Sequence, residues 1–222
     1  MKDLTILIPT YNRNRFSLLC AYNINHQDYS GIKEVIVMDD GKETLDINFF
    51  CIYPVRYIKK SKHMSIGAKR NALVKQCNTK YYAFMDDDDV YFPEYISHSL
   101  EILKSCSKYK IVGSTEMLFY FKDIQKYGGM SCTTLHLPHE ATFVGYTKWL
   151  KTNKFKDTSS SEGSFLKGIA HQFLGLTDIS HCMCCVVHKK NTISKNNWYK
   201  EQYEKRYRNL LESKIENHLS FL

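Results

Sequence analysis

Short apolar segments alternate with longer amphipathic ones through the first half of the chain. The apolar segments are predicted to be buried strands at residues 4–8, 34–38, 55–58 and 80–85. The segments between them carry apolar side chains at helical spacing, at residues 15–27, 66–77 and 93–105. Strands that alternate with helices predict an α/β fold, in which helices cover both faces of a mostly parallel sheet.

Beyond residue 110 this alternation weakens. The sequence still predicts strands at residues 111–113, 117–121 and 183–187, and a helix at about 162–170 after a polar loop. The length of 222 residues suits one domain with a C-terminal extension better than two domains.

Polar side chains follow three of the predicted strands, at Thr10-Tyr11, Asp39-Asp40 and residues 86–89. Ligands of parallel sheets gather beyond the carboxyl ends of the strands. The four consecutive aspartates at 86–89 supply the oxygen ligands that Mg²⁺ and Mn²⁺ prefer, and such ions often complete their shells with phosphate oxygens. The sequence therefore predicts a metal and diphosphate site at this edge, with a solvated acidic turn as the alternative.

Charge and cysteine content limit the class of protein. The formal net charge of +8 suits an anionic partner. The eight cysteines lack framework spacing, no apolar run approaches the length of a membrane span, and the N-terminus shows no signal-peptide pattern. We therefore expect reduced thiols and a cytoplasmic location.

Four segments resemble, in order and spacing, the nucleotide-binding half of a known family. They are TILIPTYNR (5–13), VIVMDDG (35–41), GAKRNALV (67–74) and FMDDDDVYFP (84–93). Over residues 4–95 the chain resembles nucleotide-sugar-dependent glycosyltransferases of the GT-A fold, in particular inverting family 2. The resemblance implies a Rossmann-like sheet and a transfer, dependent on Mn²⁺ or Mg²⁺, from a nucleotide-diphospho-sugar to an acceptor hydroxyl.

The resemblance also implies how the chain is divided. Residues 1–194 would form a single GT-A domain, with a nucleotide-binding half at 1–95 and an acceptor and catalytic half at 96–194. Residues 195–222 would form an amphipathic C-terminal helix that packs onto the domain or forms a homodimer, with peripheral membrane contact as a further alternative. A glycan, protein or lipid acceptor is expected, and no nucleic acid.

The resemblance assigns donor-binding residues in the first half. Pro9 and Tyr11 follow the first strand, and Tyr11 would pack against the nucleoside. Asp40 would accept a hydrogen bond from the base, unless the Asp39-Asp40 pair only makes an Asx turn before Gly41. Arg70 would reach the nucleotide from a helix, and Lys69 is the alternative for that role.

The aspartate run needs a register, which its downstream proline supplies. The family pattern D-x-D-D, three residues and Pro maps onto Asp86, Asp87, Asp88, Asp89 and Pro93. By the resemblance, Asp86 would contact ribose and metal, and Asp88 would coordinate the metal. Asp87 belongs to the donor-binding set, although strand alternation turns its side chain away from Asp86 and Asp88. Asp89 would orient its neighbours or approach the sugar.

His188 follows the predicted strand 183–187, where the resemblance implies a late metal ligand. An ordinary strand-end histidine is the alternative. The nearby residues 181–185 (HCMCC) are too tightly spaced for a C-x₂-C zinc site, and their cysteines are predicted to lie in the core.

An inverting transferase needs a general base for the acceptor hydroxyl. The resemblance assigns this role to Glu162, in the segment SSSEGSFL, with Asp157 in reserve. The segment departs from the family at Gly163, where an acid is common, and Glu162 has the alternative role of stabilising a helix N-terminus. By a looser resemblance, Thr142 and Gly145 line the sugar and acceptor pocket.

Three other classes of protein are alternatives to a transferase. A catalytically silent sugar-nucleotide-binding module would keep the same fold. A receiver-type signalling domain would carry its paired aspartates after the first strand, whereas here they follow the second. A nucleotidyltransferase would be expected to carry a glycine-rich phosphate loop near the N-terminus, and none is visible.

Overall fold

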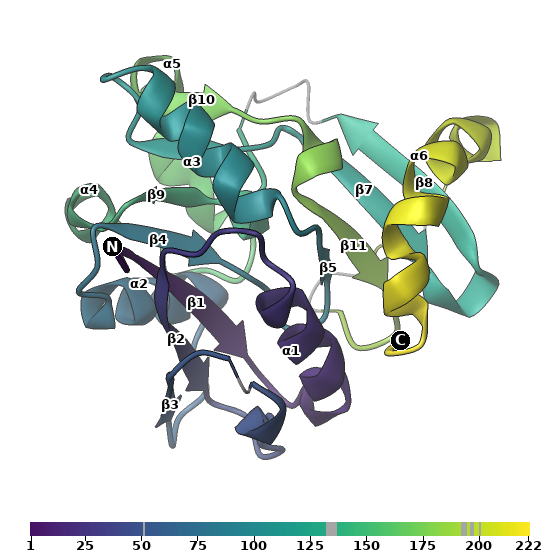
Figure 1. The fold of residues 1–222 in the computed structure, drawn as a ribbon, viewed down its shortest axis with the longest axis horizontal. Coiled ribbons are helices and arrows are strands. Elements are labelled where there is room, and N and C mark those ends of the chain that lie inside the picture. Colours follow the sequence, from purple (N-terminus) through teal and green to yellow (C-terminus); the bar gives the residue numbers. More distant parts are fainter. Residues whose placement is uncertain (51, 132–136, 192–194, 196–197, 200) are drawn as a thin grey trace.

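Two sheets form the framework of the molecule (Figure 1). The structure is a computed structural model, which describes the chain except residues 51, 132–136, 192–194, 196–197 and 200, and only the backbone of residues 201–206. The larger sheet has seven strands in the order β10-β6-β9-β4-β1-β2-β3. These strands are β1 (Leu4–Thr10), β2 (Ile32–Asp39), β3 (Val55–Lys59), β4 (Tyr81–Phe84), β6 (Ile111–Gly113), β9 (Val144–Tyr146) and β10 (Leu174–Leu176).

Most pairs in this sheet are parallel, as predicted. β1 lies between β2 and β4 and is parallel to both, β3 is parallel to β2, and β10 is parallel to β6. β9 runs antiparallel between β4 and β6. The sequence did not predict β9 or β10, because a three-residue strand with a central glycine has no periodicity of its own.

Helices cover both faces of the larger sheet (Figure 1). They are α1 (Ser17–Asn25) and α3 (Tyr95–Ser105) on one face, and α2 (Ile66–Gln76) and α4 (Thr147–Thr152) on the other. Successive residues of β1 serve opposite faces: Ile6 and Ile8 join the core that includes Leu19 of α1, and Leu7 joins the core that includes Leu73 of α2. The strand run is therefore apolar throughout because both of its faces are buried.

The helix predicted over residues 162–170 takes a different form. A 3₁₀ helix, η5 (Glu162–Leu166), is followed by Gly168 at φ +83° and by the short helix α5 (Ala170–Phe173). A positive φ is incompatible with a continuous right-handed helix, so the segment divides at this glycine.

The smaller sheet brings the late part of the chain to the aspartate run. Its order is β5-β11-β7-β8, formed by β5 (Val90–Tyr91), β11 (Met183–Val187), β7 (Glu116–Phe121) and β8 (Lys126–Ser131). β11 is antiparallel to β5, with Cys184 opposite Val90. Because β5 directly follows residues 86–89, this pairing places the end of β11 beside the carboxylates.

The C-terminal helix α6 (Glu201–Leu219) packs on the domain beside β8 (Figure 1). Leu211 and Ile215 are fully buried, and the ring of Tyr207 lies so close to Gly129 that a Cβ there would sit 2.6 Å from it. Lys214 Nζ lies 2.5 Å from Glu94 Oε1. The predicted packing of this helix onto the domain is confirmed. None of the described helices has the length and apolar character needed to cross a bilayer.

Six described cysteines, at 20, 77, 106, 182, 184 and 185, are free thiols, and Cys182, Cys184 and Cys185 are buried. The prediction of core cysteines in residues 181–185 is therefore confirmed.

We expect Ile215→Ala to lower the free energy of unfolding by about 2–5 kcal/mol, because it removes a fully buried side chain and leaves a cavity. Leu210→Ala, on the same helix at a side chain that is 37% exposed, should cost less than about 1 kcal/mol. Urea denaturation of both variants measures the difference. Equal losses would contradict docking of α6 through Ile215.

Candidate active site

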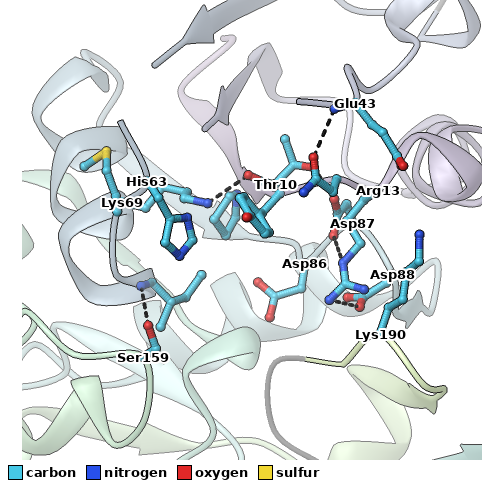
Figure 2. Close-up of a pocket in the computed structure, with 15 residues that line it drawn as sticks. Thr10, Arg13, Glu43, His63, Lys69, Asp86, Asp87, Asp88, Ser159 and Lys190 are labelled. Atoms are coloured by element: carbon cyan, nitrogen blue, oxygen red, sulfur yellow. Dashed lines mark hydrogen bonds and ion pairs between the residues drawn. The ribbon is translucent and has the colours of Figure 1, made fainter. Parts of the chain in front are cut away.

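The loops that follow β1, β2 and β4 meet at the carboxyl edge of the larger sheet, as predicted, and two of them supply most of a cavity there (Figure 2). The cavity has a volume of about 480 Å³. Its lining comes from the three strand ends and the loops after them, from the loop before α2 and the start of that helix, and from two later loops. The lining residues are Pro9, Thr10, Tyr11, Asn12, Arg13, Glu43, His63, Met64, Ile66, Lys69, Asp86, Asp87, Asp88, Ser159 and Lys190.

Asn12 and Gly41 lock the first two loops together. Asn12 has a left-handed backbone at φ 55°, and its Oδ1 accepts the N–H groups of Lys42 at 2.6 Å and Glu43 at 3.0 Å. A Cβ at Gly41 would lie 2.4 Å from the backbone nitrogen of Asn12, so this contact requires glycine. The tyrosine before Asn12 is thereby held at the cavity wall.

Tyr11, His63 and Lys69 lie together in the lining of the cavity. Figure 2 shows His63 and Lys69 next to each other. The ring of Tyr11 is 44% exposed and lies 4.4 Å, centroid to centroid, from the ring of His63. Lys69 Nζ donates to the carbonyl of Thr10 at 2.8 Å and lies 5.7 Å from the Tyr11 ring. An exposed aromatic face beside imidazole and ammonium donors suits a heterocyclic base.

Asp40 lies behind this wall and not on it. Its side chain has 0% exposure, and its oxygens are bound by Lys69, by the N–H of Met64 at 2.6 Å and by His63 Nδ1 at 3.0 Å. Asp40 therefore positions Lys69 and His63, which do line the cavity. The Asx turn, the alternative considered for this pair, is formed by Asp39, whose Oδ1 accepts the N–H of Gly41 at 2.7 Å.

The four aspartates at 86–89 bind different sets of partners, although Arg13 lies near both Asp87, at 4.0 Å, and Asp88. Asp86 pairs with Arg70 at 3.0 Å, Asp87 accepts the hydroxyl of Thr10, and Asp89 accepts the N–H of Val186 at 2.9 Å. Asp88 Oδ2 lies 3.0 Å from Arg13 Nη2 and 3.0 Å from His188 Nε2. Asp87 thus turns toward Thr10 on the β1 side, and Asp89 binds the backbone of strand β11.

Burial separates the protonation behaviour of these acids. It raises the pKa of Asp89 to about 7, with the charge of Asp88 adding to the effect, and it raises the pKa of Asp87 well above its ordinary value. For Asp88 burial acts in the same direction, but the hydrogen bond from His188 and the charge of Arg13 hold its pKa below the ordinary value. Asp88 is therefore the acid of these three that stays ionised.

The carboxylates of Asp86 and Asp88 suit a divalent cation by their chemistry, and both line the cavity. His188 is close but is arranged differently. Its Nδ1 faces two donors, the N–H of Lys190 at 3.1 Å and Arg15 Nη2 at 3.0 Å. Asn191 Nδ2, a third donor, lies 3.3 Å from Nε2, which also faces Asp88, so these contacts fit either ring tautomer.

Within the described residues, no group of three or more His, Cys, Asp or Glu side chains is arranged to hold a metal ion. Metal binding by Asp86, Asp88 and His188 stays a prediction.

A second cavity of about 160 Å³ adjoins the first, and the two share Arg13, Ile66, Asp86, Asp88 and Ser159. The rest of its lining comes from α2, from the aspartate run, from the turn at 139–140, from η5 and the loop before it, and from the segment after β11. These residues are Arg70, Asp89, His139, Glu140, Ser160, Ser161, Glu162, Asn191, Lys195 and Trp198. The shared aspartates therefore stand between a cavity with an exposed aromatic ring and one with further acids.

Glu162 begins η5 at the second cavity. Its side chain is 7% exposed, and Arg70 Nε lies 3.5 Å from its Oε1. Burial raises the pKa of Glu162 to about 7, with Arg70 opposing the rise and Glu140 adding to it. A carboxylate with this pKa suits general-base chemistry near neutral pH.

Other predicted residues lie elsewhere. Asp157 binds the hydroxyl of Ser65, which caps α2, and it does not appear among the described residues lining these two cavities. Thr142 is fully buried and donates to the carbonyl of His139 at 2.6 Å, and Gly145 lies within β9 opposite Tyr82. Thr142 and Gly145 therefore have structural positions. Arg70 lines the second cavity, and Lys69, the alternative for the nucleotide-binding role, lines the first cavity.

Sequence reasoning missed Arg13, Glu140, His63 and Lys190 as cavity residues. Arg13 belongs to the TYNR segment and could have been found there. The other three reach the site through loops whose course the local sequence does not specify.

Comparison with known proteins identifies the family. Residues 5–156 match the family model described as glycosyl transferase family 2. This chain belongs to glycosyltransferase family 2. Similar curated proteins include uncharacterized glycosyltransferases of Haemophilus influenzae, 26% identical over 101 residues, and of Rickettsia prowazekii, 29% identical over 110 residues. These matches cover 46% and 49% of this chain and 34% of each relative, so the chain spans about a third of the relatives' length.

Solved structures show the same fold at low identity. S. aureus TarS 1-349 in complex with UDP-GlcNAc has a TM-score of 0.64 at 15% identity, covering 99% of this chain and 73% of that one. The mannosyltransferase PcManGT from Pyrobaculum calidifontis, in complex with GDP-Man and Mn²⁺, has a TM-score of 0.62 at 13% identity, covering 85% and 58%. The fold of this chain is the GT-A fold.

Arg13→Gln should bind Mn²⁺ about tenfold more tightly than the wild type, a gain of ~1.4 kcal/mol, because the guanidinium and the ion compete for Asp88. Titration of free Mn²⁺ by electron paramagnetic resonance measures this affinity.

Lys190→Gln is the matched control, since it removes one charge from the same cavity wall and leaves Arg13 on Asp88. Equal gains in both variants would contradict a specific competition. Pulsed resonance should detect an imidazole nitrogen on bound Mn²⁺ that disappears in His188→Gln. A wild type without this nitrogen signal would contradict His188 as a ligand.

Proposed function

We propose that this chain binds a nucleotide-diphospho-sugar and transfers its glycosyl group to an acceptor hydroxyl with inversion. One observation carries the proposal: Asp86 and Asp88 stand where two cavities adjoin, one with Tyr11, His63 and Lys69, the other with Glu162. A donor whose base lies in the first cavity would have its diphosphate at the junction and its sugar toward the second. The neighbouring folds bind donors of this kind, UDP-GlcNAc in TarS and GDP-Man in PcManGT.

The residues of the first cavity supply the groups that a nucleoside requires. The exposed ring of Tyr11 offers a stacking face, and His63 and Lys69 offer polar contacts at its edge. At the junction, Arg13 and Lys190 add positive charge for the diphosphate (Figure 2). Asp86 and Asp88 would hold Mn²⁺ or Mg²⁺, which when bound would neutralise charge on the departing diphosphate.

In the second cavity Glu162 is the proposed general base. The acceptor hydroxyl would lose its proton to Glu162 as its oxygen bonds to the anomeric carbon, while the bond from that carbon to the diphosphate breaks on the opposite face. Arg70, itself 2% exposed, holds Glu162 and Asp86 at fixed positions. Attack from the face opposite the leaving group gives inversion.

Several finer points stay predictions. We expect a glycan, a protein or a lipid as acceptor. A homodimer or peripheral membrane contact through residues 195–222 and a cytoplasmic location stay predictions. A catalytically silent sugar-nucleotide-binding module is the alternative, and the two experiments below separate it from an enzyme.

A panel of nucleotide-sugars with and without Mn²⁺ should reveal the donor by thermal shift. At 100 times the dissociation constant, a ligand stabilises the fold by about 2.7 kcal/mol, or about 5–10 °C in Tm for a chain of this size. We expect one nucleotide class to reach this shift, with a larger shift in Mn²⁺. No shift with any donor would refute the proposal.

Glu162→Gln should lower turnover by about 10²–10⁴-fold with an unchanged donor thermal shift, because it removes the base and keeps the side-chain shape. In the wild type, turnover should rise with pH through about 7, since the ionised form of Glu162 is the active one. Asp157→Asn is the control and should keep the wild-type rate and profile. An active Glu162→Gln variant, or a product that retains the donor's anomeric configuration, would contradict this mechanism. A wild type that binds donor without turnover would support the silent binding module.

A further inference from the structure

The carboxylate of Glu140 occupies the space that a side chain at position 163 would need. A Cβ at Gly163 would lie 2.7 Å from Glu140 Oε1 and 2.8 Å from its Cγ. The N–H of Gly163 donates to the same Oε1 at 2.8 Å. The resemblance to family 2 implies an acid at position 163, and here the carboxylate of Glu140 lies against that position although residue 163 is glycine.

A rigid turn delivers Glu140 to this place. It begins the 3₁₀ helix η4 (Glu140–Thr142), and the carbonyl of Ala141 accepts the buried hydroxyl groups of Tyr91 at 3.1 Å and Tyr95 at 3.4 Å. His139 caps the turn, with its Nδ1 accepting the N–H of Ala141 at 3.4 Å. The backbone of the turn is therefore held from β5 and α3, and the carboxylate itself accepts the N–H of Gly163 in η5.

The surroundings of Glu140 are acidic. Glu140 lines the second cavity with Asp86 and Glu162, and Arg70 is the cation that faces these acids most directly. The Arg70 side chain is 3% exposed, and its Nη1 has no hydrogen-bond partner among the described residues. A third carboxylate beside one buried arginine adds repulsion, and such a cost is typical of a functional site.

We propose that Glu140 is a second catalytic carboxylate of the transfer site, delivered by η4 to the place of the acid that position 163 lacks. The inference rests on the proposed function. Glu140 would accept a hydrogen bond from the acceptor and keep a negative charge near the anomeric carbon, which becomes positive as its bond to the diphosphate breaks. The proton of the acceptor still passes to Glu162, so Glu140 itself neither forms nor breaks a covalent bond.

Glu140→Gln tests the charge alone, because glutamine keeps an oxygen that can accept the Gly163 N–H. We expect turnover to fall about 100-fold while the donor thermal shift stays unchanged, since Glu140 does not line the first cavity. Glu101→Gln, on the exposed side of α3, is the matched control and should keep the wild-type rate. A loss of less than tenfold in Glu140→Gln overturns the inference.

Two further variants test the shared space. Gly163→Asp alone should lose activity and stability, because its Cβ meets Glu140, whereas Glu140→Ala with Gly163→Asp should recover at least tenfold over Glu140→Ala. Gly163→Ala should lower Tm less in the Glu140→Ala background than in the wild type. Equal losses of Tm in both backgrounds would show that Glu140 and a side chain at position 163 do not compete for the same space. This test needs no activity measurement.

The two failures are distinguishable. A wild type that turns over no donor refutes the proposed function, and the inference falls with it. An active enzyme that is indifferent to Glu140→Gln removes the inference alone.

Discussion

Two buried arginines make the aspartate run possible. Four consecutive carboxylates that are largely removed from water repel one another, and an unpaired buried charge costs several kcal/mol. Arg13, from the end of β1, reaches Asp88, and Arg70, from α2, reaches Asp86. The loop therefore depends on cations from two different elements, and the sheet order that puts β1 beside β4 is what brings them together.

The smaller sheet completes this compensation from far along the sequence. Because β11 pairs with β5, the N–H of Val186 meets Asp89 and the ring of His188 meets Asp88. Both contacts depend on the register of β11 against β5, since each uses the direction of a single side chain or N–H. Strand β11 and the residues after it thus bind the aspartates of the proposed donor site, and they also line the second cavity.

The sequence predicted the strands and helices that carry their own apolar pattern. It did not predict positions that depend on contacts with residues far away in the sequence. β1, β2, β4 and α2 each carry their own apolar pattern, and the polar residues after the strands had to meet at one edge. Asp40 follows β2 at the expected edge of the sheet, but the burial of its side chain depends on Lys69 and His63, which come later in the chain. β9 is held by its neighbours on both sides, so its three residues carried no signal.

Gly163 shows how a departure from a pattern can be informative. Taken alone, a glycine in the place of an acid suggests a lost function. In the structure a Cβ at position 163 would lie 2.7 Å from Glu140 Oε1, so the present position of this carboxylate requires glycine there. The glycine and the glutamate are therefore one feature: a substitution at either position changes the space available to the other, and neither can be interpreted from its own segment of sequence.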